Sequence, residues 1–138
     1  MADCCKTETK RIYACSGAAD VGEFADRVAR KLRTNGIARM SCLAGIGAGL
    51  SGYVQSAKGV DINITIDGCN IACARKTLEN IGVTPVSYIL TDMVLVRGET
   101  SITEKAIAEI CTKIKSTGAQ PSPPVQTGDG GCSCGGKC

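Results

Sequence analysis

Ten of the 138 residues are cysteines, and three of them recur at a constant interval. Cys15, Cys42 and Cys69 lie 27 positions apart, and Cys73 follows Cys69 closely. Each of the first three comes at the carboxyl end of a predicted strand. Because the carboxyl ends of neighbouring parallel strands lie roughly 5 Å apart at one edge of a sheet, we expect these thiols to meet there, with Cys73 beside them. Four thiolates form a tetrahedral site whose usual occupant is zinc, with Zn–S bonds near ~2.3 Å.

Cys69 and Cys73 flank the predicted start of a helix. The stretch 60–66 alternates β-branched and polar residues, which predicts a strand, and 71–81 has an apolar face at helical spacing that includes Ile71 and ends before Gly82. Free amides and the dipole at a helix start favour thiolate, so we expect both thiols to ionise below the roughly 8.5 of ordinary cysteine. They are candidates for a metal-ligand pair or a reactive dithiol. The residues expected to support the ligands by hydrogen bonding or charge are Ser16, Asp67, Gly68, Arg75 and Lys76.

Composition excludes several classes of protein. The chain has no histidine, so imidazole ligands and Cys-His nucleophile pairs are excluded. A net charge of +3 and 3% aromatic residues do not fit a nucleic-acid-binding surface. No apolar run reaches the roughly 18 to 20 residues of a membrane span, and the N-terminus does not resemble a secretory signal. We expect no membrane insertion and a cytoplasmic location, where thiols stay reduced.

Strands and helices alternate along the chain, which predicts a single-domain, three-layer α/β/α fold with a mainly parallel sheet of four or five strands, similar to flavodoxin or Rossmann folds. Further strands are expected at 11–15, 37–42 and 84–91, and 93–99 is either a loop or a fifth strand. Capping boxes at Asp20/Glu23 and Ser101/Glu104 predict two amphipathic helices, and the glycine-rich run 43–52 leads into a short one. The predicted divisions are a flexible arm at 1–9, a metal-binding domain at 10–116, and a disordered, cysteine-rich tail at 117–138.

The remaining cysteines fall into two groups. Cys111 lies on the apolar stripe of the last helix, which indicates a core residue. The others are in the polar terminal segments and are candidate accessory ligands for soft metal ions: Cys4, Cys5, Cys132, Cys134 and Cys138.

These motifs resemble the DGC-domain family of zinc-binding proteins, named for the tripeptide Asp67-Gly68-Cys69. The resemblance covers 11–116 and includes Cys15, Cys42 and Cys73, since four cysteines are the hallmark of the family. It implies a bound zinc ion. Members also look like companions of arsenic permeases and small redox proteins in bacteria, so the resemblance implies handling of metals or metalloids, with a small redox protein or a metal transporter as partner.

Three alternatives remain at this stage. The four cysteines could be core residues, although ordinary packing gives no reason for their equal spacing. The metal could be purely structural, because a closed four-thiolate site has no open position for substrate; this also favours a binding protein over an enzyme. Finally, the chain could be a thiol-disulfide or sulfur-transfer enzyme in which Cys69 attacks and Cys73 or a tail cysteine resolves the intermediate.

Overall fold

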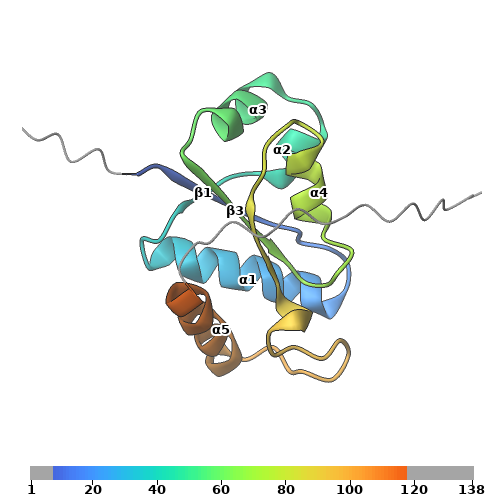
Figure 1. Cartoon of the computed structure of the whole chain (residues 1–138). Coiled ribbons are helices and arrows are strands. Elements are labelled where there is room, and N and C mark those ends of the chain that lie inside the picture. Colours follow the sequence, from blue (N-terminus) through green and yellow to red (C-terminus); the bar gives the residue numbers. More distant parts are fainter. Residues whose placement is uncertain (1–7, 118–138) are drawn as a thin grey trace, which may run out of the picture.

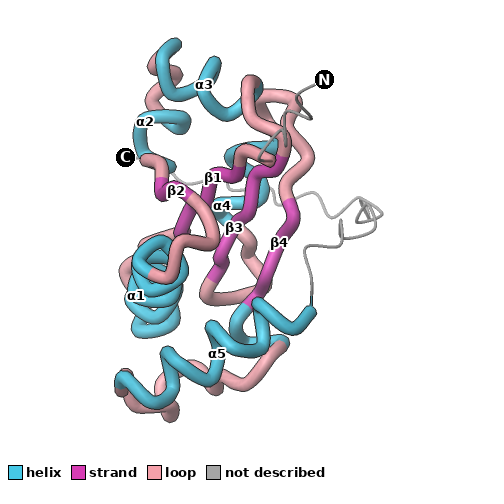
Figure 2. The backbone as a smooth tube through the Cα atoms, turned by 90° about the vertical axis from the view of Figure 1, so that its left-hand side faces the viewer, coloured by secondary structure: helices cyan, strands magenta, loops and turns pink. Residues whose placement is uncertain are grey.

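A computed structural model describes residues 8–117 as an α/β fold around one parallel sheet. The strand order is β2-β1-β3-β4, as Figure 2 shows, and every pairing is parallel. This confirms the predicted fold class. The elements are β1 (Lys10–Ala14), α1 (Asp20–Thr34), β2 (Arg39–Met40), α2 (Leu43–Gly47), α3 (Ser51–Lys58), β3 (Ile62–Asp67), α4 (Cys73–Glu79), β4 (Val86–Ile89), the 3-10 turn η1 (Leu90–Asp92) and α5 (Glu104–Thr117).

The two faces of the sheet differ in polarity. Helices α1 and α5 lie on one side, and α2, α3 and α4 lie on the other (Figure 1). The α1 side is apolar because Ile64 and Ile66 of β3 point into the main core. The opposite side carries Asn63, Thr65 and Asp67, all at most 6% exposed. The polar residues of β3 are therefore buried too, so the alternation in this strand separates two buried faces rather than a buried face from a solvated one.

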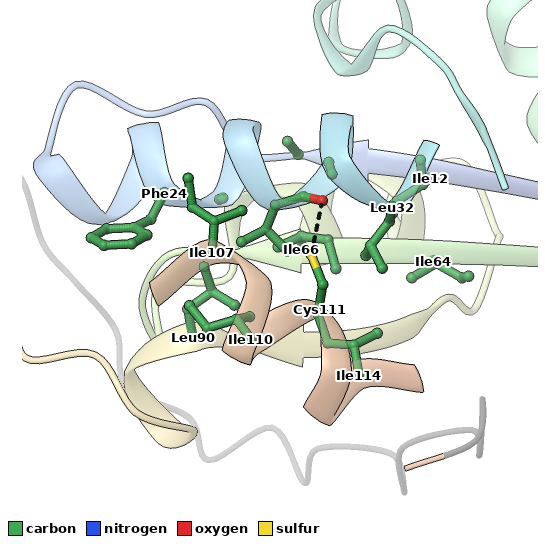
Figure 3. Packing of buried hydrophobic residues seen from close by; sticks show 14 of the residues in the cluster. Ile12, Phe24, Leu32, Ile64, Ile66, Leu90, Ile107, Ile110, Cys111 and Ile114 are labelled. Carbon is green, nitrogen blue, oxygen red and sulfur yellow. Dashed lines mark hydrogen bonds between the residues drawn. The ribbon is translucent and has the colours of Figure 1, made fainter. Parts of the chain in front are cut away.

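Helix α5 closes the main core, as Figure 3 shows. Ile107, Ile110 and Ile114 pack toward α1 and the sheet. Cys111 is 2% exposed among them, and its sulfur lies 3.8 Å from the carbonyl oxygen of Val28. Its predicted role as a core residue is confirmed. None of the described helices is long and apolar enough to cross a membrane.

Several local predictions were wrong. The glycine-rich run contains a helix of its own, α2, before α3 begins. For 93–99 the loop alternative is the correct one, since these residues form turns and loop, and the described part of the chain has four strands. Ile71 is 55% exposed and precedes α4 instead of packing on its apolar face. The reason is that Ala72 adopts a left-handed conformation (φ +53°), which is incompatible with an α-helix. The helix therefore begins only at Cys73.

Neither predicted capping box forms. Ala19 precedes α1 and makes no side-chain cap, whereas Asp20 accepts a hydrogen bond of 2.7 Å from the distant amide of Gly98. At α5, Thr103 replaces Ser101 as the cap, since its hydroxyl oxygen accepts the Ala106 N–H at 3.2 Å. Both capping-box predictions fail because tertiary contacts and the direction of the chain decide which side chain can reach the free amides.

Asp20 gives a prediction about pH. The Gly98 N–H lowers the pKa of this carboxyl from its ordinary value of 3.8. A lowered pKa in the folded protein adds stability above the ordinary pKa, and this stability is lost as the pH falls through the lowered value. Asp20→Asn should therefore melt below wild type at neutral pH and converge with it in acid, measured by thermal unfolding against pH. A constant gap at all pH values would contradict the assignment; Glu99→Gln, at an exposed site, is the control.

Candidate metal centre at the carboxyl edge of the sheet

Three cysteines follow three adjacent strands. Cys15 comes directly after β1, Cys42 two residues after β2, and Cys69 two residues after β3. These strands are neighbours in the order β2-β1-β3 and run in the same direction. The register aligns the carboxyl ends of the three strands, since the Ser41 N–H donates to Ile12 O and the Cys15 N–H donates to Ile66 O, each at 3.0 Å. The structure thus brings the three cysteine-bearing loops to one edge of the sheet.

Cys15 lies where the strand order reverses. After β1 the chain adds β2 on one side and β3 on the other, and loops at such a reversal commonly form the ligand site of parallel α/β proteins. Here the Gly68 N–H donates a hydrogen bond to the Cys15 sulfur at 3.3 Å. Gly68 was predicted to support the ligands, and this is its observed contact with one of them.

Close packing of glycines makes that contact geometrically feasible. A Cβ on Gly68 would lie 2.5 Å from the carbonyl carbon of Val21 and 3.0 Å from the nitrogen of Gly22. A Cβ on Gly22 would lie 2.6 Å from the nitrogen of Gly17. The loops after β1 and β3 therefore meet the start of α1 through backbone atoms alone, and no side chain fits between them.

Asp67 fixes the start of α4, where Cys73 is the first residue. Its carboxylate is fully buried and accepts the N–H groups of Ala74 at 2.8 Å and Arg75 at 3.1 Å. Burial raises the pKa of this carboxyl, whereas the two amides and the charges of Arg75 and Lys76 oppose the rise. The aspartate of the Asp67-Gly68-Cys69 tripeptide is thus a helix cap that positions Cys73.

Of the other predicted supporting residues, Ser16 and Arg75 have local partners. Ser16, at a left-handed φ of +47°, donates to the Asp26 carboxylate at 3.2 Å. Arg75 donates to Glu79 at 2.8 Å along α4. Lys76 is exposed on the same helix. These contacts orient the loops and α4 around the cysteines rather than reaching the sulfur atoms.

The thiols differ in environment. Cys15 and Cys69 are partly buried, whereas Cys42 and Cys73 are exposed, and all four are free. Burial raises the pKa of Cys15, and the nearby Asp67 and Cys73 raise it further, against hydrogen bonds from Gly68 and Gly17. Across residues 8–117, no group of three or more acidic or cysteine side chains lies close enough together to hold a metal ion. The cysteines predicted in the arm and tail, Cys4, Cys5, Cys132, Cys134 and Cys138, lie outside the described residues.

A broad cleft opens beside this edge, and no sequence pattern predicted it. It has a volume of about 1070 Å³, and both Cys15 and Cys42 line it. Arg11, Arg30 and Arg33 line the same cleft. The spacing of Arg30 and Arg33 on α1 could have indicated a shared face, but only the tertiary fold places Arg11 of β1 in the same cleft.

The fold and this edge define a parallel α/β protein whose cysteine-bearing loops surround a strand-order reversal. The chain belongs to the DGC domain family, whose model matches residues 11–114, as the tripeptide and cysteine pattern predicted. It is also similar to the anaerobic and virulence modulator AnvM of Pseudomonas aeruginosa, with 32% identity over 78 residues. That match covers 56% of this chain and 60% of AnvM, so it spans less than two thirds of the relative. No solved structure matches the chain.

Proposed function

We propose that this domain binds zinc or another soft metal ion through Cys15, Cys42, Cys69 and Cys73. The observation that carries the proposal is the position of three of these cysteines after three adjacent parallel strands at one edge of the sheet. The fourth cysteine begins the helix that Asp67 caps beside them.

The chemistry of the donor set fits such an ion. Four thiolates suit tetrahedral zinc, and the Gly68 N–H supplies a hydrogen bond to one sulfur that offsets thiolate charge. Forming the full shell requires the exposed side chains of Cys42 and Cys73 to turn inward from their present positions. Because the pKa of Cys15 is raised, metal must displace its proton, so the affinity should increase with pH.

The wider role we propose is the handling of soft metals or metalloids. Membership of the DGC domain family supports a shared domain. The terminal cysteines would exchange ions with the domain, and a small redox protein or a metal transporter would be the partner. Thiolate is a soft ligand in the domain and in the terminal segments alike, and soft ligands favour soft ions, which is the chemical basis for linking the two.

The test is the metal content of the reduced, full-length chain. Wild type should retain one zinc ion in the domain after dialysis, and cobalt substituted for zinc should give the absorption of a tetrahedral thiolate site. Cys→Ser at 15, 42, 69 or 73 should each weaken binding by more than the roughly 10- to 100-fold that loss of a supporting partner costs.

Two control variants separate the domain from the rest of the chain. Cys111→Ala removes a core thiol 3.8 Å from Val28 O and should leave metal content unchanged. Replacing Cys4, Cys5, Cys132, Cys134 and Cys138 together by serine should leave the domain ion in place. A wild type that binds no metal but forms a reversible Cys69–Cys73 disulfide would contradict the proposal and favour the thiol-disulfide enzyme.

A further inference from the structure

The cleft beside the cysteine-bearing edge has an excess of positive charge. It lies at the β2 edge of the sheet, between α1 and the α2–α3 pair, whose positions Figure 2 shows. Its charged lining consists of Arg11, Arg30, Arg33 and Asp26. Arg30 donates to the Asp26 carboxylate at 2.6 Å, which cancels one pair of charges. Among the described residues, this leaves the guanidinium groups of Arg11 and Arg33 uncompensated in the cleft.

In the part of the chain that the structure describes, neither remaining arginine is neutralised by a carboxylate. Within residues 8–117, no carboxylate forms an ion pair with Arg11 or Arg33. The Nε atom of Arg11 is buried and has no hydrogen-bond partner in the described structure. An unpaired buried donor lowers the stability of the fold, so the folded chain keeps this guanidinium in place at a cost in stability.

A third arginine increases the positive potential. Arg39 of β2 pairs in register with Arg11 of β1, so the two side chains leave the same face of the sheet roughly 5 Å apart. Like charges directly opposite one another in a sheet repel. Arg11 and Arg33 also line an adjoining cleft together with Arg39. A bound anion would relieve this repulsion and supply the missing acceptors.

We propose that this cleft binds a small molecule bearing an oxyanion, either carboxylate or phosphate, through Arg11 and Arg33. Arginine presents a planar fork of donors that matches both groups. The hydroxyl-bearing residues Tyr53 and Ser56 also line the cleft and could add neutral donors. Because Cys15 and Cys42 line the same space, the bound anion lies beside two of the proposed metal ligands.

The experiment uses the reduced full-length chain with metal removed by a chelator, so its outcome does not depend on metal binding. Isothermal titration with inorganic phosphate and with succinate measures binding, and the stronger of the two identifies the type of oxyanion. We expect one saturable site for at least one probe. Arg33→Met should weaken that binding about tenfold or more, because charge-assisted hydrogen bonds are lost. Arg11→Met should weaken the binding to a similar extent. If Arg11→Met fails to fold, Arg33→Met still provides the test, because Arg33 is exposed.

The matched control is Arg27→Met. Arg27 is another exposed arginine of α1, but it pairs with Glu23 and does not line the cleft. Its replacement should leave the affinity unchanged. Occupancy of the site should also slow alkylation of Cys42 by the neutral reagent iodoacetamide, followed by peptide mass spectrometry. No saturable binding of either probe, equal weakening by Arg27→Met, or binding that leaves Cys42 unprotected would each overturn the proposal.

Discussion

Gly68→Ala is expected to destabilise the fold by about 2 to 4 kcal/mol, because there is no space for a methyl group at this position. The added Cβ would lie 2.5 Å from the carbonyl carbon of Val21 and 3.0 Å from the nitrogen of Gly22. These are backbone atoms at the start of α1, so relief requires the loop after β3 to move away from the helix. The free energy of unfolding, measured by urea denaturation, tests this.

Gly52→Ala is the matched control for this substitution. Gly52 lies in α3, and a Cβ there would have no atom within 4 Å. Alanine is the better helix former, so this variant should be as stable as wild type or more stable by up to about 1 kcal/mol. Equal stabilities of the two variants would show that the approach of the loop to α1 is not needed for the fold.

Asp67→Ala is expected to cost a similar amount, for a different reason. It removes the acceptor of two N–H groups, those of Ala74 and Arg75, at the buried start of α4. Each unsatisfied buried donor costs about 1 to 3 kcal/mol. Since α4 begins with Cys73, the loss should also loosen the position of this thiol, and faster alkylation of Cys73 is the second measurement. Loss of stability without faster Cys73 alkylation would contradict a positioning role.

The pH dependence of Asp67 has the opposite sign to that of Asp20. Burial raises the pKa of Asp67, so this group stabilises the fold below its ordinary pKa and loses that contribution as the pH rises through the raised value. Asp67→Asn has no such titration. Its stability relative to wild type should therefore improve from acid to neutral pH. An unchanged difference across that range would show that Asp67 does not titrate with a raised pKa.

Much of the fold was predictable because local patterns of apolar residues indicate the individual strands and helices. The β-branched alternation of β3 and the apolar stripe of α5 correspond to the elements observed. The length of β2 was overestimated because 37–42 has apolar residues at alternating positions near its end, yet the strand pairs only over Arg39–Met40. Helix α2 was missed because glycines obscure a helical pattern; Gly45 is required there, since a Cβ would lie 2.6 Å from the Tyr53 ring.

Caps were the least predictable feature. Ser101 and Thr103 are equally good caps by residue type, and only the path of the chain into α5 places the Thr103 hydroxyl near the Ala106 amide. Similarly, nothing near Asp20 in the sequence indicates Gly98, which lies 78 residues away. Such contacts depend on loops that meet only after the sheet has formed.

The sequence by itself determined the α/β class, the family and the cysteines at the ends of strands, because strand alternation, helix periodicity and the Asp67-Gly68-Cys69 tripeptide are local properties of the chain. The tertiary structure decided which of these residues became neighbours. Parallel strands are joined by crossovers, so their order is set by how the helices pack on both faces rather than by any short pattern. That strand order places Gly68 against Cys15, and it places Arg11 in one cleft with Arg33.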